Sequence, residues 1–391
     1  MNHSDPLLKQ LDRIQHRSLL VGIVAAVACA AGAVYTPQQF FRSYLMAYLF
    51  WSGISLGCFA LVMLHHLVGG GWGFLIRRML ESGTRTMPLM ALFVVPVLLG
   101  LRYLYVWTHP GAVAADRLLE HKQIYLNVPF FVARTAAYFA LWILLAYFLN
   151  KWSSRQDRSD DPALRRRLNN LSGPGLVLYG LTVTLASLDW VMSLEPDWFS
   201  TIFSALFMIG QVLSTLAFVI ALLMLVASRS SLSEILSSRY MNDLGNLLLT
   251  FVMLWAYMAF SQFLIIWSGN LPDEITWYLD RMKGGWEWIA VLLIVFHFAV
   301  PFLLLLFRGV KRRIRVLSAL AAAMLVVRLV DMFWTVEPAF DRGGLRFHWL
   351  DWVVPVAMGG IWIAVFVWQL KRRPLLPLHD PLLREVLEQS A

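Results

Sequence analysis

The chain has 391 residues, of which 59% are hydrophobic and only 15% are charged, with a net charge of +9. Soluble globular proteins have about 45–50% apolar and about 25% charged residues, so this composition excludes an ordinary water-soluble chain. The apolar runs are about 20 residues long and do not alternate with polar residues, which excludes a membrane β-barrel. The sequence therefore predicts an all-α polytopic membrane protein.

Ten transmembrane spans are predicted, each an apolar run bounded by charges, Gly, Pro or polar turns. In chain order they cover residues 18–36, 43–68, 86–107, 128–150, 174–194, 200–228, 244–268, 285–307, 314–336 and 347–370. With the N-terminus inside, the inside segments carry 23 Lys and Arg, counting Arg315 at the inner start of the ninth span, and the outside loops carry 7. This bias predicts that both termini are cytoplasmic, and it accounts for the positive charge without a nucleic-acid partner.

Two features of the first third of the chain bear on this topology. The first span follows a charged leader, and we expect it to be retained as a helix rather than cleaved as a signal peptide. Between the second and third spans, Trp72 to Leu80 predict a short interfacial helix on the inner side. We expect its apolar face to lie toward lipid and Arg77 and Arg78 to lie at the headgroups.

The cysteines and histidines do not support a metal centre. Cys29 and Cys58 lie in different apolar runs, whereas iron–sulfur clusters usually take four thiolates and structural zinc sites four Cys or His ligands. His65 and His297 are offset by about ten residues in depth, about 15 Å along a helix, too far to ligate one haem. The sequence predicts no metal, no iron–sulfur cluster and no haem in this chain.

A motif, D-x3-[ST]-x-E-P, occurs twice, at 189–196 and at 331–338. The copies end the fifth and ninth spans, four helices apart, so both helices cross in the same direction and the repeat is parallel. It predicts two four-helix units, residues 43–194 and 200–336. The segments 1–42 and 347–391 then supply flanking helices and tails.

Each copy of the motif places two carboxylates near the predicted outer end of its helix. Proline disfavours helical angles at the preceding Glu, so we expect each helix to stop there. The negative end of the helix dipole and desolvation both favour the protonated acid. Asp189, Glu195, Asp331 and Glu337 are therefore candidates for proton transfer toward the outer surface. A structural alternative, in which Glu-Pro only ends a helix and Asp caps a neighbour, stays open.

Other ionisable residues at membrane depth each cost roughly 2.5–3.5 kcal/mol on insertion scales. Arg328 precedes Asp331 by three residues and is expected to pair with it. His297, near the middle of the eighth span, could bond a neighbouring helix or contact a proton or ligand. Arg102 and Arg134 could reach the outer headgroups or belong to a site. These residues lie in the outer half, and we expect few polar groups in the inner half.

Three stretches around the motifs carry a family resemblance. They read SLDWVMSLEPDWFSTIF at 187–203, NLPDEITWYLDRMKGGW at 270–286 and VRLVDMFWTVEPAF at 327–340. Here the chain resembles the F subunit of alternative complex III, a bacterial quinol:electron-acceptor oxidoreductase. That subunit belongs to the wider NrfD/polysulfide-reductase group of membrane subunits. The resemblance covers essentially the whole chain.

The resemblance implies a multi-pass subunit of the bacterial inner (cytoplasmic) membrane, beside a related quinol-binding membrane subunit. Periplasmic iron–sulfur and haem c subunits are implied on its outer face, and a quinone such as menaquinone is implied as a possible ligand. The four motif acids match the outer-facing acids of the family. We assign His297, on depth alone, and Arg328 to quinone binding. The resemblance leaves open whether this chain itself takes part in catalysis.

Two other functions stay open on the sequence. Parallel repeats also build secondary transporters, although paired Gly or Pro interruptions at matching positions are not evident. A scaffold subunit, whose buried acids are structural, is equally compatible with the motif. Pumping of protons through this chain alone is disfavoured, because the inner half is expected to lack the polar residues that a full path needs.

Overall fold

The structure is a computed structural model that describes residues 6–159, 161–227, 238–341 and 343–374. No strand occurs in these ranges, so the described chain is all-α. Within them, nine helices are long and apolar enough to cross a membrane, and one bent helix pair brings the number to ten. The prediction of an all-α polytopic membrane protein is confirmed.

Eight of the long helices are regular. They are α1 (Pro6–Tyr35), α2 (Pro37–Val68), α8 (Val128–Gln156), α9 (Pro162–Trp190), α10 (Phe203–Ala227), α12 (Ser238–Gly269), α17 (Ile314–Val336) and α18 (Leu350–Lys371). The ninth runs through α14 (Trp286–Leu292), the π-helix η3 (Leu293–Ala299) and α15 (Val300–Leu306). The bent pair is α3 (Gly71–Thr84) and α4 (Met87–Leu99). Short helices join them: α5 (Leu101–Leu104), η1 (Val106–Thr108), α6 (Pro110–Ala115), α7 (Arg117–Lys122), η2 (Met192–Leu194), α13 (Pro272–Arg281), α16 (Arg308–Arg312) and η4 (Glu337–Ala339).

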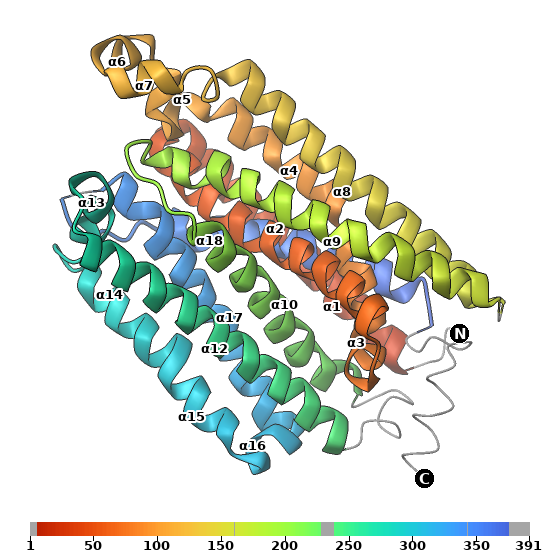
Figure 1. Cartoon of the computed structure of the whole chain (residues 1–391). Helices are drawn as coiled ribbons and strands as arrows, with labels where there is room; N and C mark the ends of the chain where they lie inside the picture. The colour runs from red at the N-terminus through yellow and green to blue at the C-terminus, as the bar shows by residue number, and fades with distance from the viewer. Residues whose placement is uncertain (1–5, 160, 228–237, 342, 375–391) are drawn as a thin grey trace.

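The helices form one elongated bundle with two distinct ends (Figure 1). We call the end at which α9 and α17 finish the outer end; α6, α7 and α13 lie there. The opposite, inner end holds α3 and the last turns of α8. These names follow the topology predicted from charge, which stays a prediction, as does the division into two four-helix units.

The central helix of the bundle is α2, whose apolar segment is 94% buried. It packs against α10, α18, α9, α3 and α4. Close approach depends on small residues, since a Cβ added at Gly57 would lie 2.4 Å from the carbonyl oxygen of Gln211 on α10. Association of helices in lipid relies on such backbone proximity, because burial of apolar surface contributes little there. Helices α1 and α18 also approach closely at glycines, because Gly22 faces Gly360.

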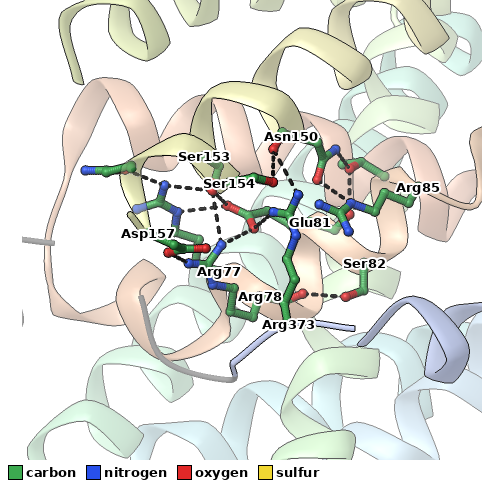
Figure 2. A network of polar contacts seen from close by, with 12 residues as sticks. Arg77, Arg78, Glu81, Ser82, Arg85, Asn150, Ser153, Ser154, Asp157 and Arg373 are labelled. Atoms are coloured by element: carbon green, nitrogen blue, oxygen red, sulfur yellow. Dashed lines mark hydrogen bonds and ion pairs between the residues drawn. The ribbon is translucent and has the colours of Figure 1, made fainter. Parts of the chain in front are cut away.

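The inner-end helix α3 corrects the prediction of an interfacial helix. Arg77 and Arg78 are each only 2% exposed, and α3 continues into α4 with a bend of 43°. Glu81 pairs with Arg77 at 2.9 Å and with Arg78 at 2.7 Å, and Ser153 on α8 donates to Glu81. Figure 2 shows these groups gathered in one network. Arginines can be buried when they are paired and hydrogen-bonded. This network lies at the inner end, outside the predicted spans, so the expectation of few polar groups in the inner half of the spans stays a prediction.

The two motif helices end differently. On the first, α9 stops at Trp190 and η2 follows, which leaves Glu195 at φ −121° and ψ 79°. On the second, α17 runs to Val336, and Glu337 keeps helical angles of φ −64° and ψ −36°. The expected non-helical conformation before proline is thus found at Glu195 and not at Glu337. Pro338 lies in the first turn of η4, a position at which proline is common because its fixed φ suits the start of a helix.

Candidate functional site at the outer end

A cavity of about 640 Å³, the outer cavity, lies among α10, α12, α13, α14, η3 and α17. Most of its lining is apolar or aromatic. Five of the lining side chains are also exposed on the surface of the bundle: Met253, Tyr257, Phe260, Met282 and Ile294. The cavity therefore opens sideways, toward the surface that faces lipid in the predicted topology.

The polar groups that line the outer cavity include Gln262, Tyr278, Arg281, Arg328 and Asp331. The Gln262 amide donates to the Tyr278 hydroxyl at 3.3 Å. Burial raises the pKa of Tyr278 to about 12, so its phenol keeps its proton at neutral pH. Hydroxyl, amide and guanidinium groups thus face the same apolar space as one carboxylate.

Arg328 and Asp331 form a buried ion pair on α17, between Nη1 of the arginine and Oδ2 of the aspartate. Their side chains are 5% and 7% exposed, and both line the cavity. The pairing predicted from their spacing is confirmed. Because α17 supplies both partners at i and i+3, the pair forms without help from another helix.

Gly210 on α10 makes room for the Arg328 guanidinium. A Cβ at Gly210 would lie 2.0 Å from Nη2 and 2.9 Å from Nη1 of Arg328. The guanidinium therefore packs directly on bare backbone of α10. A side chain at this position would push it out of its present place beside Asp331.

Replacing Gly210 with alanine is expected to destabilise the protein by about 1–3 kcal/mol, the usual cost of overpacking. Thermal unfolding of the purified chain in detergent measures this. Gly180→Ala on α9 is the matched control, since a Cβ there meets nothing within 4 Å. Equal stability of the two variants would show that Arg328 is not held against α10.

Arg281 on α13 joins the two copies of the motif. Its Nη2 donates to Oε1 of Glu195 at 2.9 Å and to the carbonyl of Thr335 at 2.9 Å, and its Nε donates to the carbonyl of Trp334 at 3.3 Å. The guanidinium also lies 3.7 Å from the ring centre of Trp277. It thereby satisfies carbonyls in the last turn of α17, which lack partners within the helix. Burial lowers the pKa of Arg281, and Glu195 opposes that shift.

Asp189, the aspartate of the first copy, lies in a closed cluster outside the cavity. Arg134 on α8 donates to its two carboxylate oxygens at 3.0 and 2.7 Å, and the Tyr138 hydroxyl donates at 2.9 Å. Asp189 is 0% exposed, and the Arg134 guanidinium lies over the ring of Tyr125 at 3.8 Å. The Arg134 guanidinium is therefore paired with a buried acid and does not extend to the outer headgroups.

Glu337, the glutamate of the second copy, is 5% exposed, and its Oε1 has no hydrogen-bond partner among the described residues. Arg42 and Asp351 are among the charged groups whose fields reach it. Asp351 itself accepts hydrogen bonds from Gln39 at 2.9 Å and from Ser43 at 2.6 Å. The two glutamates of the motif thus differ, because Glu195 has an arginine partner and Glu337 belongs to a looser polar group.

His297 lies in the π-helix η3 and is completely buried. Neither ring nitrogen has a hydrogen-bond partner within the described chain. Its ring centre is 4.0 Å from that of Trp255, which lines the outer cavity, whereas His297 does not. Its assignment to quinone binding stays a prediction. Single-turn π-helices occur often at functional sites, which is consistent with it.

The structure brings together only part of the predicted site. Arg328 and Asp331 line the cavity, whereas the other four predicted residues lie behind its wall or at other places near the outer end. Sequence reasoning missed Arg281, although it lies in the loop 270–286 that carries the family resemblance. The only sequence signal for a role of Arg281 was its position as the single arginine of this loop, close to Trp and Tyr residues. Its partner Glu195 lies 86 positions away, a separation that no local spacing rule reveals.

Metal ligands are not gathered in the part of the chain that the structure describes: no three His, Cys, Asp or Glu side chains there could hold an ion. Cys29 and Cys58 are free, buried thiols. No protein-family model matches the chain, and no curated protein is significantly similar to it. The outer cavity and the charged groups around it are therefore the basis for assigning a function.

Proposed function

We propose that this chain is a membrane subunit of a bacterial respiratory quinol:electron-acceptor oxidoreductase of the alternative complex III type, and that its outer cavity binds the quinol. The observation that supports this most directly is a laterally open, mainly apolar cavity that ends on a buried ion pair, Arg328 and Asp331. Proposed partners are lipid, a related quinol-binding membrane subunit, and periplasmic iron–sulfur and haem c subunits.

The cavity fits a quinol in size and in chemistry. Small-molecule sites measure about 300–1,000 Å³ and combine apolar walls with a few placed polar groups. Its 640 Å³ and its polar wall meet both conditions. The ring would lie near Arg328, Asp331 and Arg281, and an isoprenoid tail would leave past Phe260 and Ile294 toward lipid.

Oxidation of a quinol supplies two electrons and two protons, and the electrons would pass to the metal-containing partner subunits. In this chain Asp331 is the group placed to take a hydroxyl proton, because it faces the cavity and Arg328 stabilises its ionised form. Glu337 lies six positions further along the same segment, about 9 Å toward the outer surface. Asp189 and Glu195 are held by Arg134 and Arg281, which favours a structural role for them.

A photoreactive menaquinone analogue tests the proposal in the complex isolated through a tag on this chain. We expect labelled peptides from α12 and α17, and we expect excess unlabelled quinone to abolish the labelling. Labelling confined to another subunit would contradict quinone binding here and favour a scaffold. Substrate flux by the purified chain in liposomes, without redox partners, would favour a transporter instead.

A further inference from the structure

A second cavity, the inner cavity, lies at the inner end and measures about 580 Å³. It opens where α3 turns into α4 and where the last turns of α8 pass them. Five basic side chains line it, and no Asp or Glu of the described residues does so. The five are Arg85, Lys151, Arg155, Arg158 and Arg373.

Two acids beside this cavity, Glu81 and Asp157, are already paired. Glu81 is shared by Arg77, Arg78 and Arg373, the last at 3.3 Å, and Asp157 pairs with Arg78. In Figure 2 the carboxylate of Glu81 lies at the centre of this group. Three arginines thus surround two carboxylates behind the wall of the cavity. These two carboxylates therefore do not neutralise the other basic side chains that line the inner cavity.

Those other basic groups keep an uncompensated charge. Within the described chain, no ion pair is found for Arg85, Lys151, Arg155 or Arg158. Arg85 is fixed by a hydrogen bond from its Nε to Oδ1 of Asn150 at 2.8 Å. A half-buried guanidinium held in this way, with three more cations around one concave space, presents a field that suits an anion with several oxygens.

The surface next to the inner cavity is apolar. Tyr147 on α8 and Pro88 on α4 line the cavity and are exposed. Toward the middle of the bundle, Leu144 follows on α8 with 53% exposure and Leu92 on α4 with 62%. These two helices pack against each other, so their exposed side chains form a surface that continues from the cavity.

We propose that the inner cavity binds the phosphate headgroup of an anionic phospholipid whose acyl chains lie along α4 and α8. The charge complements a phosphodiester, and the adjoining exposed apolar surface argues for a lipid over a free phosphate. Basic pockets between transmembrane helices at the cytoplasmic side are known to bind anionic headgroups. The inference does not depend on quinol binding at the other end of the bundle.

Lipid titration of the full chain in a neutral detergent tests the proposal, with the thermal midpoint as the readout. We expect dioleoyl phosphatidylglycerol to raise the midpoint, and dioleoyl phosphatidylcholine and inorganic phosphate to leave it unchanged. The variant Arg155→Gln/Arg158→Gln removes two exposed cations of the cavity and should weaken the apparent affinity for phosphatidylglycerol about tenfold or more. Both side chains are exposed, so the variant should fold.

The control is Arg165→Gln/Arg166→Gln, which removes two exposed arginines of α9 that do not line the cavity. It should bind the anionic lipid as the unmodified chain does. Equal weakening in both variants would show a general charge effect and overturn the site. An equal rise of the midpoint with inorganic phosphate would overturn the assignment to a lipid.

Discussion

Replacing Asp331 with asparagine is expected to lower quinol oxidation by the assembled complex by about 10² or more, the usual contribution of a placed proton acceptor. The carboxylate faces the outer cavity, and asparagine fills the same space without accepting a proton. Steady-state turnover with a soluble quinol measures the effect, and the amount of complex recovered through the tagged chain reports assembly.

Because asparagine leaves Arg328 buried without its partner, a second variant separates chemistry from folding. The double variant Asp331→Asn/Arg328→Gln removes both charges. We expect more assembled complex than with Asp331→Asn alone, and the same low turnover rate. Asp189→Asn is the matched control in the other copy of the motif. Asp189 pairs with Arg134 away from the cavity, so its loss should reduce recovery rather than turnover per complex. An unchanged turnover rate after replacement of Asp331 would contradict its role as the proton acceptor.

The second large effect is expected at Arg281, whose replacement by methionine should lower the unfolding free energy by about 3–5 kcal/mol. This side chain holds Glu195 and the last carbonyls of α17 at once, and it is 1% exposed. Its loss leaves a buried carboxylate and at least two carbonyls without partners. Thermal or detergent-titration unfolding of the purified chain measures the change.

Lys283→Met provides the control for Arg281, since it removes a cation two positions away. Lys283 pairs with Asp280 at 2.7 Å but is 56% exposed, and such surface pairs contribute about 0–1 kcal/mol. Combining Arg281→Met with Glu195→Gln should recover part of the lost stability, because no buried charge is then left alone. Simple additivity of the two variants would show that Arg281 and Glu195 are not coupled.

Most of the fold could be predicted from the sequence, because spans are encoded locally. An apolar run near 20 residues must form a helix in lipid, where every backbone group needs an internal partner. The span predicted at 314–336 coincides with α17. The prediction was wrong at α3, where two adjacent arginines were assigned to the surface. Their burial depends on Ser153 and Gln156 of α8 and on Asp157 directly after it, residues far along the chain.

The candidate site was predictable only where its residues are neighbours on one helix. Arg328 and Asp331 are three positions apart, so their pairing follows from helical geometry. Arg134 and Asp189 are 55 positions apart, and Arg281 and Glu195 are 86 apart. Which arginine meets which acid depends on how four separate elements pack. The repeated motif also suggested equivalent roles for its two copies, yet Asp331 lines the cavity and Asp189 does not.

The sequence by itself determined that this chain is a helical membrane protein, and it contains an acidic motif that occurs twice. Hydropathy and spacing along one helix carry that information, because both act over a few turns. Only the tertiary structure decided which acids face an apolar cavity and that Arg281 links the two motif copies. It also decided that basic side chains from the turn between α3 and α4, from the end of α8 and from the segment after α18 surround a second cavity at the inner end. Cavities and long-range ion pairs form from elements distant in the chain, so local pattern does not specify them.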